Sequence, residues 1–191
     1  TMQLVLLVLP LVLAAQTEPH MPETLIDDFS AARSALATEW EGFTDRVMGG
    51  KSEMTVGIRS EADRPYLSMA GTVSLANNGG FIQARLPLAA EGRRYLDASK
   101  HSGIKLMVRG SGEDYYVFLR TTGNVLPWSF FMAPVPVSGE WQEVLIPWSQ
   151  FKKGDFGSLF ALNPAKLTSV AVVAYKKAFS ASLDLARISF Y

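Results

Sequence analysis

Beyond about Leu25, apolar residues alternate with polar ones in short runs that glycine, proline and asparagine interrupt. Such alternation places successive side chains on opposite faces of an extended chain, so each run predicts a β-strand with one buried face. Strands are expected at residues 25–29, 54–60, 66–73, 81–87, 103–110, 115–121, 129–135, 141–147, 169–175 and 182–190. Only residues 30–39 and 148–151 show a brief helical pattern.

Short strands without long helices between them favour antiparallel sheets, which close a core as a sandwich or a barrel. We expect an all-β sandwich. A chain of 191 residues fits one ordinary domain, and residues 25–191 are assigned to it.

One hairpin is expected in more detail, between the strands at 103–110 and 115–121, with its turn at 110–113. Its core face would carry Ile104, Leu106, Val108, Tyr115, Val117 and Leu119. Its other face would combine aromatic and cationic groups among Lys105, Met107, Arg109, Tyr116, Phe118 and Arg120. That face is either a ligand platform or an outer surface covered by packing.

The first residues have a different character. Residues 4–15 form an apolar, uncharged run that is too short to cross a bilayer, and the run ends in Ala14 and Ala15, small residues that suit signal peptidase. We expect residues 1–15 to be a signal peptide, residues 16–24 to be a linker, and the mature protein to be periplasmic or secreted. The alternative is a buried strand or an uncleaved anchor.

Charge and composition exclude several functions. The 18 basic and 18 acidic residues cancel, so there is no basic surplus for a phosphate backbone, and nucleic acid is not an expected partner. The absence of cysteine excludes disulfides, thiolate metal sites and thiol nucleophiles. With two histidines there is no cluster for zinc or proton relay. No catalytic residue, cofactor or metal is expected, although scattered carboxylates leave glycosidase chemistry and a structural calcium open.

Two glycine-containing segments predict turns. DRVMGGKS at 45–52 imitates a phosphate loop, but Asp45 stands where that loop needs glycine and a strand pattern follows instead of a helix. Gly49 and Gly50 therefore predict a turn. NNGGF at 77–81 predicts another.

A set of short motifs runs along the chain beyond Leu25. It comprises Trp40, DRVMGG with Ser52, Gly71, NNGGF, Arg85, GIKLMVRGSGEDYYVFLRT at 103–121, WQEVLIPWSQF at 141–151 and LDLARISFY at 183–191. Together these motifs resemble the complex I intermediate-associated protein family. The resemblance implies a jelly-roll sandwich of the galactose-binding-like type, a fold shared with carbohydrate-binding modules. It also implies a role as a non-enzymatic assembly factor.

The sequence is compatible with two alternative functions. The first is a protein-binding module, an assembly factor or chaperone for a membrane-associated, respiratory-type complex, whose contact surface comprises Asp45, Arg46, Asn77, Asn78 and Arg85. These side chains can instead serve their own turns or pair locally. The second is a carbohydrate-binding module, in which sugar rings stack on Tyr116, Phe118, Trp128 or Trp148. The two tryptophans can instead pin loops to the core.

Overall fold

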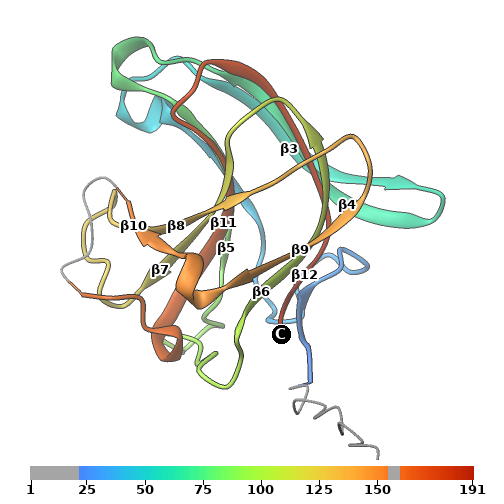
Figure 1. The fold of residues 1–191 in the computed structure, drawn as a ribbon, viewed down its shortest axis with the longest axis vertical. Coiled ribbons are helices and arrows are strands. Elements are labelled where there is room, and N and C mark those ends of the chain that lie inside the picture. Colours follow the sequence, from blue (N-terminus) through green and yellow to red (C-terminus); the bar gives the residue numbers. More distant parts are fainter. Residues whose placement is uncertain (1–21, 155–159) are drawn as a thin grey trace, which may run out of the picture.

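A computed structural model describes residues 22–154 and 160–191. The expected signal segment, residues 1–15, and most of the expected linker lie outside the described residues. The described chain forms two antiparallel sheets that face each other across one hydrophobic core (Figure 1).

The first sheet has the strand order β3-β4-β12-β6-β9, and β1 also pairs with β12. Its strands are β1 Thr24–Asp27, β3 Glu53–Glu61, β4 Arg64–Val73, β6 Gly103–Ser111, β9 Gln142–Pro147 and β12 Phe179–Phe190. The second sheet has the order β10-β8-β7-β11-β5-β2. Its strands are β2 Glu41–Thr44, β5 Phe81–Pro87, β7 Tyr115–Thr121, β8 Phe131–Val135, β10 Lys152–Lys153 and β11 Leu167–Tyr175.

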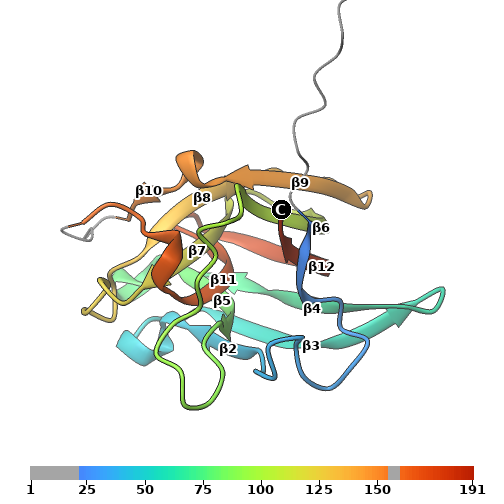
Figure 2. The ribbon, with the colours of Figure 1, turned by 90° about the horizontal axis from the view of Figure 1, so that it is seen from below.

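In Figure 2 the first sheet lies on the right, in the order β9-β6-β12-β4-β3 from top to bottom, and the second lies on the left, in the order β10-β8-β7-β11-β5-β2. The chain also makes short 3-10 turns, η1 Asp45–Met48, η2 Ala76–Asn78, η3 Trp148–Gln150 and η4 Pro164–Lys166. The expected all-β antiparallel sandwich is confirmed.

Alternation along the strands builds the core. In β5 every second residue is buried, namely Ile82, Ala84 and Leu86, and the residues between them are partly exposed. The inner faces of both sheets supply such side chains, and burial of this apolar area is the main force that holds the sheets together.

The predicted boundaries hold for most strands, and η3 confirms the short helical pattern at 148–151. The expected helical pattern at 30–39 is wrong, because this segment forms bends and turns around the side chains of Ser34 and Thr38. Strands β2 and β10 were not predicted. Both lie at the edge of a sheet and are very short, so neither contains enough alternating residues to be recognised from the sequence.

The predicted hairpin between residues 103–110 and 115–121 is wrong. Strand β6 pairs with β12 and β9 in the first sheet, whereas β7 pairs with β11 and β8 in the second. The six predicted core residues are nevertheless all buried, because they face one another across the sandwich. Alternation fixes which face of a strand is buried, but not which strand lies beside it.

This correction separates the two halves of the expected ligand platform. Lys105 and Arg109 lie on the outer face of the first sheet, and Tyr116 and Phe118 lie on the outer face of the second. They occupy opposite sides of the molecule, so they do not form one aromatic and cationic surface.

Candidate functional site

The first glycine turn begins where β2 ends. The Thr44 hydroxyl accepts a hydrogen bond from the Arg46 amide at 3.3 Å and caps η1, and Gly49 ends the turn in the left-handed region at a φ of 86°. The amides of Gly49 and Gly50 donate to the carbonyls of Arg46 and Asp45. The predicted turn is therefore confirmed.

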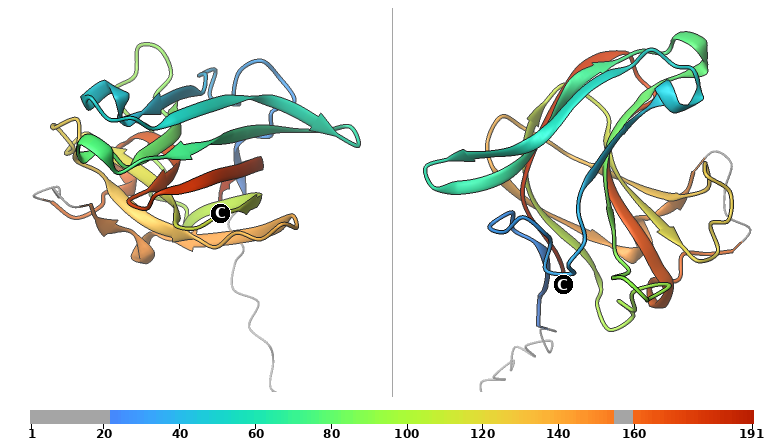
Figure 3. Two further views of the ribbon diagram at one scale, coloured as in Figure 1. Left: turned by 90° about the horizontal axis from the view of Figure 1, so that it is seen from above. Right: turned by 180° about the vertical axis from the view of Figure 1, so that it is seen from behind.

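The carboxylate of Asp45 joins this turn to the second one, 35 residues further along the chain. It accepts hydrogen bonds from the amide of Gly80 at 2.6 Å and the amide of Ser52 at 2.9 Å. The Ser52 hydroxyl donates to the same carboxylate and accepts from the Ser74 amide. Residues 45–50 and 75–80, which we call the turn pair, lie side by side at one end of the molecule (Figures 1 and 3).

The glycines leave room for this carboxylate. A β-carbon on Gly50 would lie 2.2 Å from one Asp45 oxygen, and one on Gly79 would lie 2.4 Å from the other. Asn77 and Asn78 both adopt positive φ, at 58° and 56°, which asparagine tolerates better than most residues. The two motifs DRVMGG and NNGG are thus halves of one structure.

Asp45 itself is fully buried, which corrects its expected place on the contact surface. Burial alone raises the pKa of Asp45, but hydrogen bonds from Ser52, Gly80 and Phe81 outweigh it, and the net pKa lies below its usual value. Asp45 is therefore a charged support inside the turn pair.

The side chains that the turn pair exposes include three large apolar ones. Val47 is 71% exposed, Met48 is 59% exposed and Leu75 is 50% exposed. Polar groups border them: Arg46 pairs with Glu53 at 2.7 Å, and Asn77 donates to the Gly49 carbonyl at 3.2 Å. The contact surface expected from the sequence included the polar residues of these motifs and missed the apolar ones, because only the surrounding fold determines whether an apolar residue in a turn is covered.

The structure brings together four of the expected contact residues, Asp45, Arg46, Asn77 and Asn78, but not Arg85. This arginine lies four residues beyond Phe81 in β5, or about 13 Å along the strand at about 3.3 Å per residue. Its guanidinium lies 4.3 Å from the centre of the Phe43 ring and pairs with Glu41 at 3.5 Å.

Most of the aromatic side chains that were expected to bind a sugar are at least partly covered by other residues. Phe118 is only 8% exposed, because Phe130 stacks on its ring at a centroid distance of 4.0 Å. Tyr116 lies beside this pair, edge-on to Tyr175. Trp148 donates its indole N–H to the His101 carbonyl and packs on the core, so it pins a loop.

The remaining expected binding residues, Arg109, Arg120 and Trp128, do not share one site. Arg109 pairs with Asp184 at 2.9 Å and with Glu61 at 2.6 Å. Arg120 donates to two carbonyls of the loop between β7 and β8. Burial, and then the charge of Arg85, lower the pKa of Arg120. Trp128 lies in the same loop and is 47% exposed.

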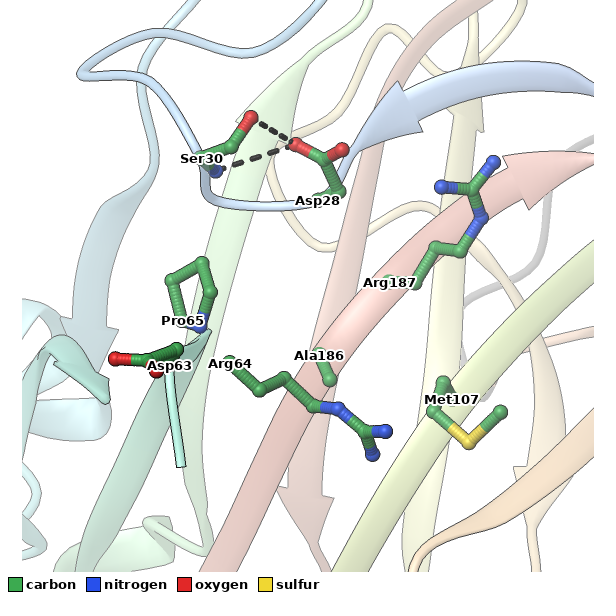
Figure 4. Close-up of a pocket in the computed structure, with 8 residues that line it drawn as sticks. All are labelled: Asp28, Ser30, Asp63, Arg64, Pro65, Met107, Ala186 and Arg187. Atoms are coloured by element: carbon green, nitrogen blue, oxygen red, sulfur yellow. Dashed lines mark hydrogen bonds between the residues drawn. The ribbon is translucent and has the colours of Figure 1, made fainter. Parts of the chain in front are cut away.

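A cleft of about 450 Å³ opens on the outer face of the first sheet (Figure 4). The side chain of Arg64 extends toward Met107, whereas that of Arg187 extends away from it, and Asp28 accepts two hydrogen bonds from Ser30 at the rim of the cleft. Arg187 is already paired with Glu23 at 3.0 Å. No motif pointed to this cleft, since its walls come from four separate segments of the chain.

Within residues 22–154 and 160–191, no group of three or more acidic or histidine side chains is placed to hold a metal ion. In the same residues, no helix is long and apolar enough to cross a membrane.

The fold is similar to that of several solved carbohydrate-binding modules. One is the family 11 module of the cellulosomal cellulase Lic26A-Cel5E of Clostridium thermocellum, with a TM-score of 0.69, 15% identity, and coverage of 88% of this chain and 94% of that one. Another is the family 30 module of the cellulosomal cellulase Cel9D-Cel44B of the same organism, with a TM-score of 0.60, 16% identity, and coverage of 90% and 98%. At these identities the similarity establishes the fold, a jelly-roll sandwich of the galactose-binding-like type.

A comparison with curated protein sequences gives no match. A family model does match, over residues 28–184, which takes in both glycine turns and the whole sandwich except β1 and the second half of β12. This chain therefore belongs to the family described as complex I intermediate-associated protein 30 (CIA30).

Proposed function

We propose that this protein is a non-catalytic protein-binding module whose contact surface is the turn pair. The observation that carries this function is the exposure of Val47, Met48 and Leu75 on turns that the buried Asp45 holds in one conformation. Exposed apolar side chains with a polar border are typical of protein interfaces. Rigid turns also lose little conformational entropy when a partner binds.

The partner we propose is a subunit of a membrane-associated, respiratory-type complex, which the protein attends as an assembly factor or chaperone. Membership of a family named for an intermediate of complex I supports a protein partner of this kind. Export, with cleavage near Ala14 or Ala15, is part of the same proposal, and N-terminal sequencing of the mature protein checks it.

The first prediction tests the contact surface with a matched pair of variants. Leu75→Glu places a charge on the turn pair, and Leu145→Glu places the same charge on β9, where the leucine is 49% exposed against 50% for Leu75. Loss of an apolar contact at the centre of an interface weakens binding about tenfold or more. We expect Leu75→Glu to reduce recovery of respiratory-complex subunits from solubilised membranes, and Leu145→Glu to match the unmutated protein.

The thermal midpoints of both variants must equal that of the unmutated protein, so that a loss of recovery reports on the surface. Equal recovery by Leu75→Glu and the unmutated protein would contradict the assignment of the turn pair. Met48→Glu, at the neighbouring turn, provides a second measurement of the same surface.

Carbohydrate binding is the second candidate, and the aromatic cluster on the outer face of the second sheet favours it. Tyr116 and Tyr175 are partly exposed there, and Gln83 and Arg85 provide hydrogen-bond donors on the same face. Phe130 covers Phe118, so a sugar would contact the margin of this cluster. Glycan binding that Tyr116→Ala abolishes, without recovery of any respiratory subunit, would favour this function.

A further inference from the structure

The loop between β7 and β8 places large apolar side chains in solvent at the opposite end of the second sheet from the turn pair. Val125 is 85% exposed, Leu126 is 49% exposed and Trp128 is 47% exposed. In Figures 1 and 2 this loop, drawn in yellow, lies at the outer left edge of the molecule. We call residues 125–128 the apolar tip.

Hydrogen bonds hold this loop in one conformation. Arg120 donates to the carbonyls of Asn124 at 3.0 Å and Leu126 at 2.8 Å. The Asn124 side chain accepts from the amide of Thr121 at 2.7 Å and donates to the hydroxyl of Ser129 at 2.8 Å. The polar residues of the loop therefore support its backbone, and the apolar ones are left for the surface.

Basic residues surround the apolar tip. Lys152 and Lys153 form β10, which pairs with β8 at the foot of the loop. Lys166 lies on the other side, where its carbonyl accepts from the Thr122 amide at 3.1 Å. The sequence of residues 121–137 and 148–168 contains these three lysines and one acidic residue, Asp155. The net charge of these segments is therefore positive.

We propose that the apolar tip docks on an anionic phospholipid membrane. Tryptophan favours the boundary between headgroups and acyl chains, where its ring is buried and its N–H remains hydrated. Leu126 and Val125 enter the same layer, and the lysines contact the lipid phosphates around them. A convex tip bordered by positive charge suits this surface better than a pocket in another protein, which would bury the tip without using the lysines.

Membrane docking leaves the turn pair accessible. Phe81 pairs with Tyr175 near the turn pair, and Pro87 pairs with Ser169 near the loop, so the length of β5 separates the two surfaces. The inference is independent of the proposed protein partner, and it places the domain next to the membrane in which such a partner would lie.

The test measures co-sedimentation with vesicles of phosphatidylcholine alone or mixed with phosphatidylserine. The full chain and a form that begins at Gln16 are compared, because residues 4–15 are themselves apolar. Leu126→Asp is matched by Leu145→Asp, since both leucines are 49% exposed. We expect Leu126→Asp and Trp128→Ala to weaken partitioning onto anionic vesicles about tenfold or more in both forms, and Leu145→Asp to leave it unchanged.

A charge-reversed Lys152→Glu, Lys153→Glu variant should lose the preference for anionic vesicles, and high salt should weaken binding by the unmutated protein. Unchanged partitioning of Leu126→Asp would overturn the proposal, as would equal binding to neutral and anionic vesicles. Loss of a crosslinked protein partner from Leu126→Asp, with no vesicle binding by the Gln16 form, would assign the tip to a protein instead.

Discussion

At the residue scale, the turn pair depends on one buried carboxylate and on the small size of the residues around it. The Asp45 carboxylate receives amide hydrogen bonds from Ser52, just beyond the first turn, and from Gly80 in the second, and Gly50 and Gly79 lie against its two oxygens. A larger residue at either glycine must displace the carboxylate or the backbone. The exposed apolar side chains on these turns therefore owe their placement to contacts that are themselves buried.

Two glycine substitutions separate this effect from a general effect of added side chains. In Gly79→Ala the new β-carbon would lie 2.4 Å from the Asp45 carboxylate, whereas a β-carbon added to Gly57 would have no atom within 4 Å other than those of its own residue and its chain neighbours. We expect Gly79→Ala to lower the free energy of unfolding by about 2–4 kcal/mol. Gly57→Ala should leave it unchanged or raise it by up to about 1 kcal/mol. Urea unfolding measures both, and equal midpoints would show that the carboxylate does not depend on Gly79.

At the scale of elements, ion pairs connect the start of β1 to neighbouring strands of the first sheet. Glu23, just before β1, pairs with Lys105 of β6 and Arg187 of β12, each at 3.0 Å. Burial alone raises the pKa of Glu23, but the nearby Ser189 side chain and the hydrogen bonds from Lys105 and Arg187 outweigh it and lower the pKa to about 2. A carboxyl whose pKa is lower in the folded state stabilises that state when ionised.

Glu23→Gln should therefore loosen β1 in a pH-dependent way. The stabilisation by Glu23 is complete well above 4.5, the pKa that this carboxyl has in the unfolded chain, and is lost as the pH falls toward about 2. At neutral pH we expect the variant to lose about 1–2 kcal/mol, since its partners are partly exposed. Hydrogen exchange at the amides of β1 should be faster than in Glu143→Gln, which also removes a Lys105 partner. No difference between the two variants would contradict this role.

At the scale of the whole molecule, the sandwich holds two apolar surfaces apart. The turn pair lies at one end of the second sheet, and the apolar tip lies at the other (Figure 3). The core between them is continuous, so neither surface needs the other in order to form. The two proposed activities should therefore fail independently.

A crossed experiment measures this independence. Leu75→Glu should lose protein recovery and keep vesicle binding, and Leu126→Asp should keep protein recovery from detergent extracts and lose vesicle binding. The double variant should show both losses, each of the same size as in the single variant, because distant sites are additive. Loss of both activities in either single variant would indicate one shared surface or an unfolded protein.

Local patterns in the sequence were sufficient to predict the fold class, most strand positions and the buried faces of β6 and β7. These features follow from alternation, because a side chain's face depends only on its position along its own strand. The family also followed from the motifs, and its model matches residues 28–184.

Only the tertiary structure determined which strands are neighbours. It also determined which residues from distant parts of the chain come into contact. It separated Arg109 from Phe118, placed Asp45 inside the turn pair, and left Leu75 and Leu126 exposed. Such features depend on contacts between distant segments, and alternation along a single strand carries no information about them. The exposed apolar residues had no sequence signal strong enough to single them out, since the surrounding fold determines whether a leucine in a turn is covered.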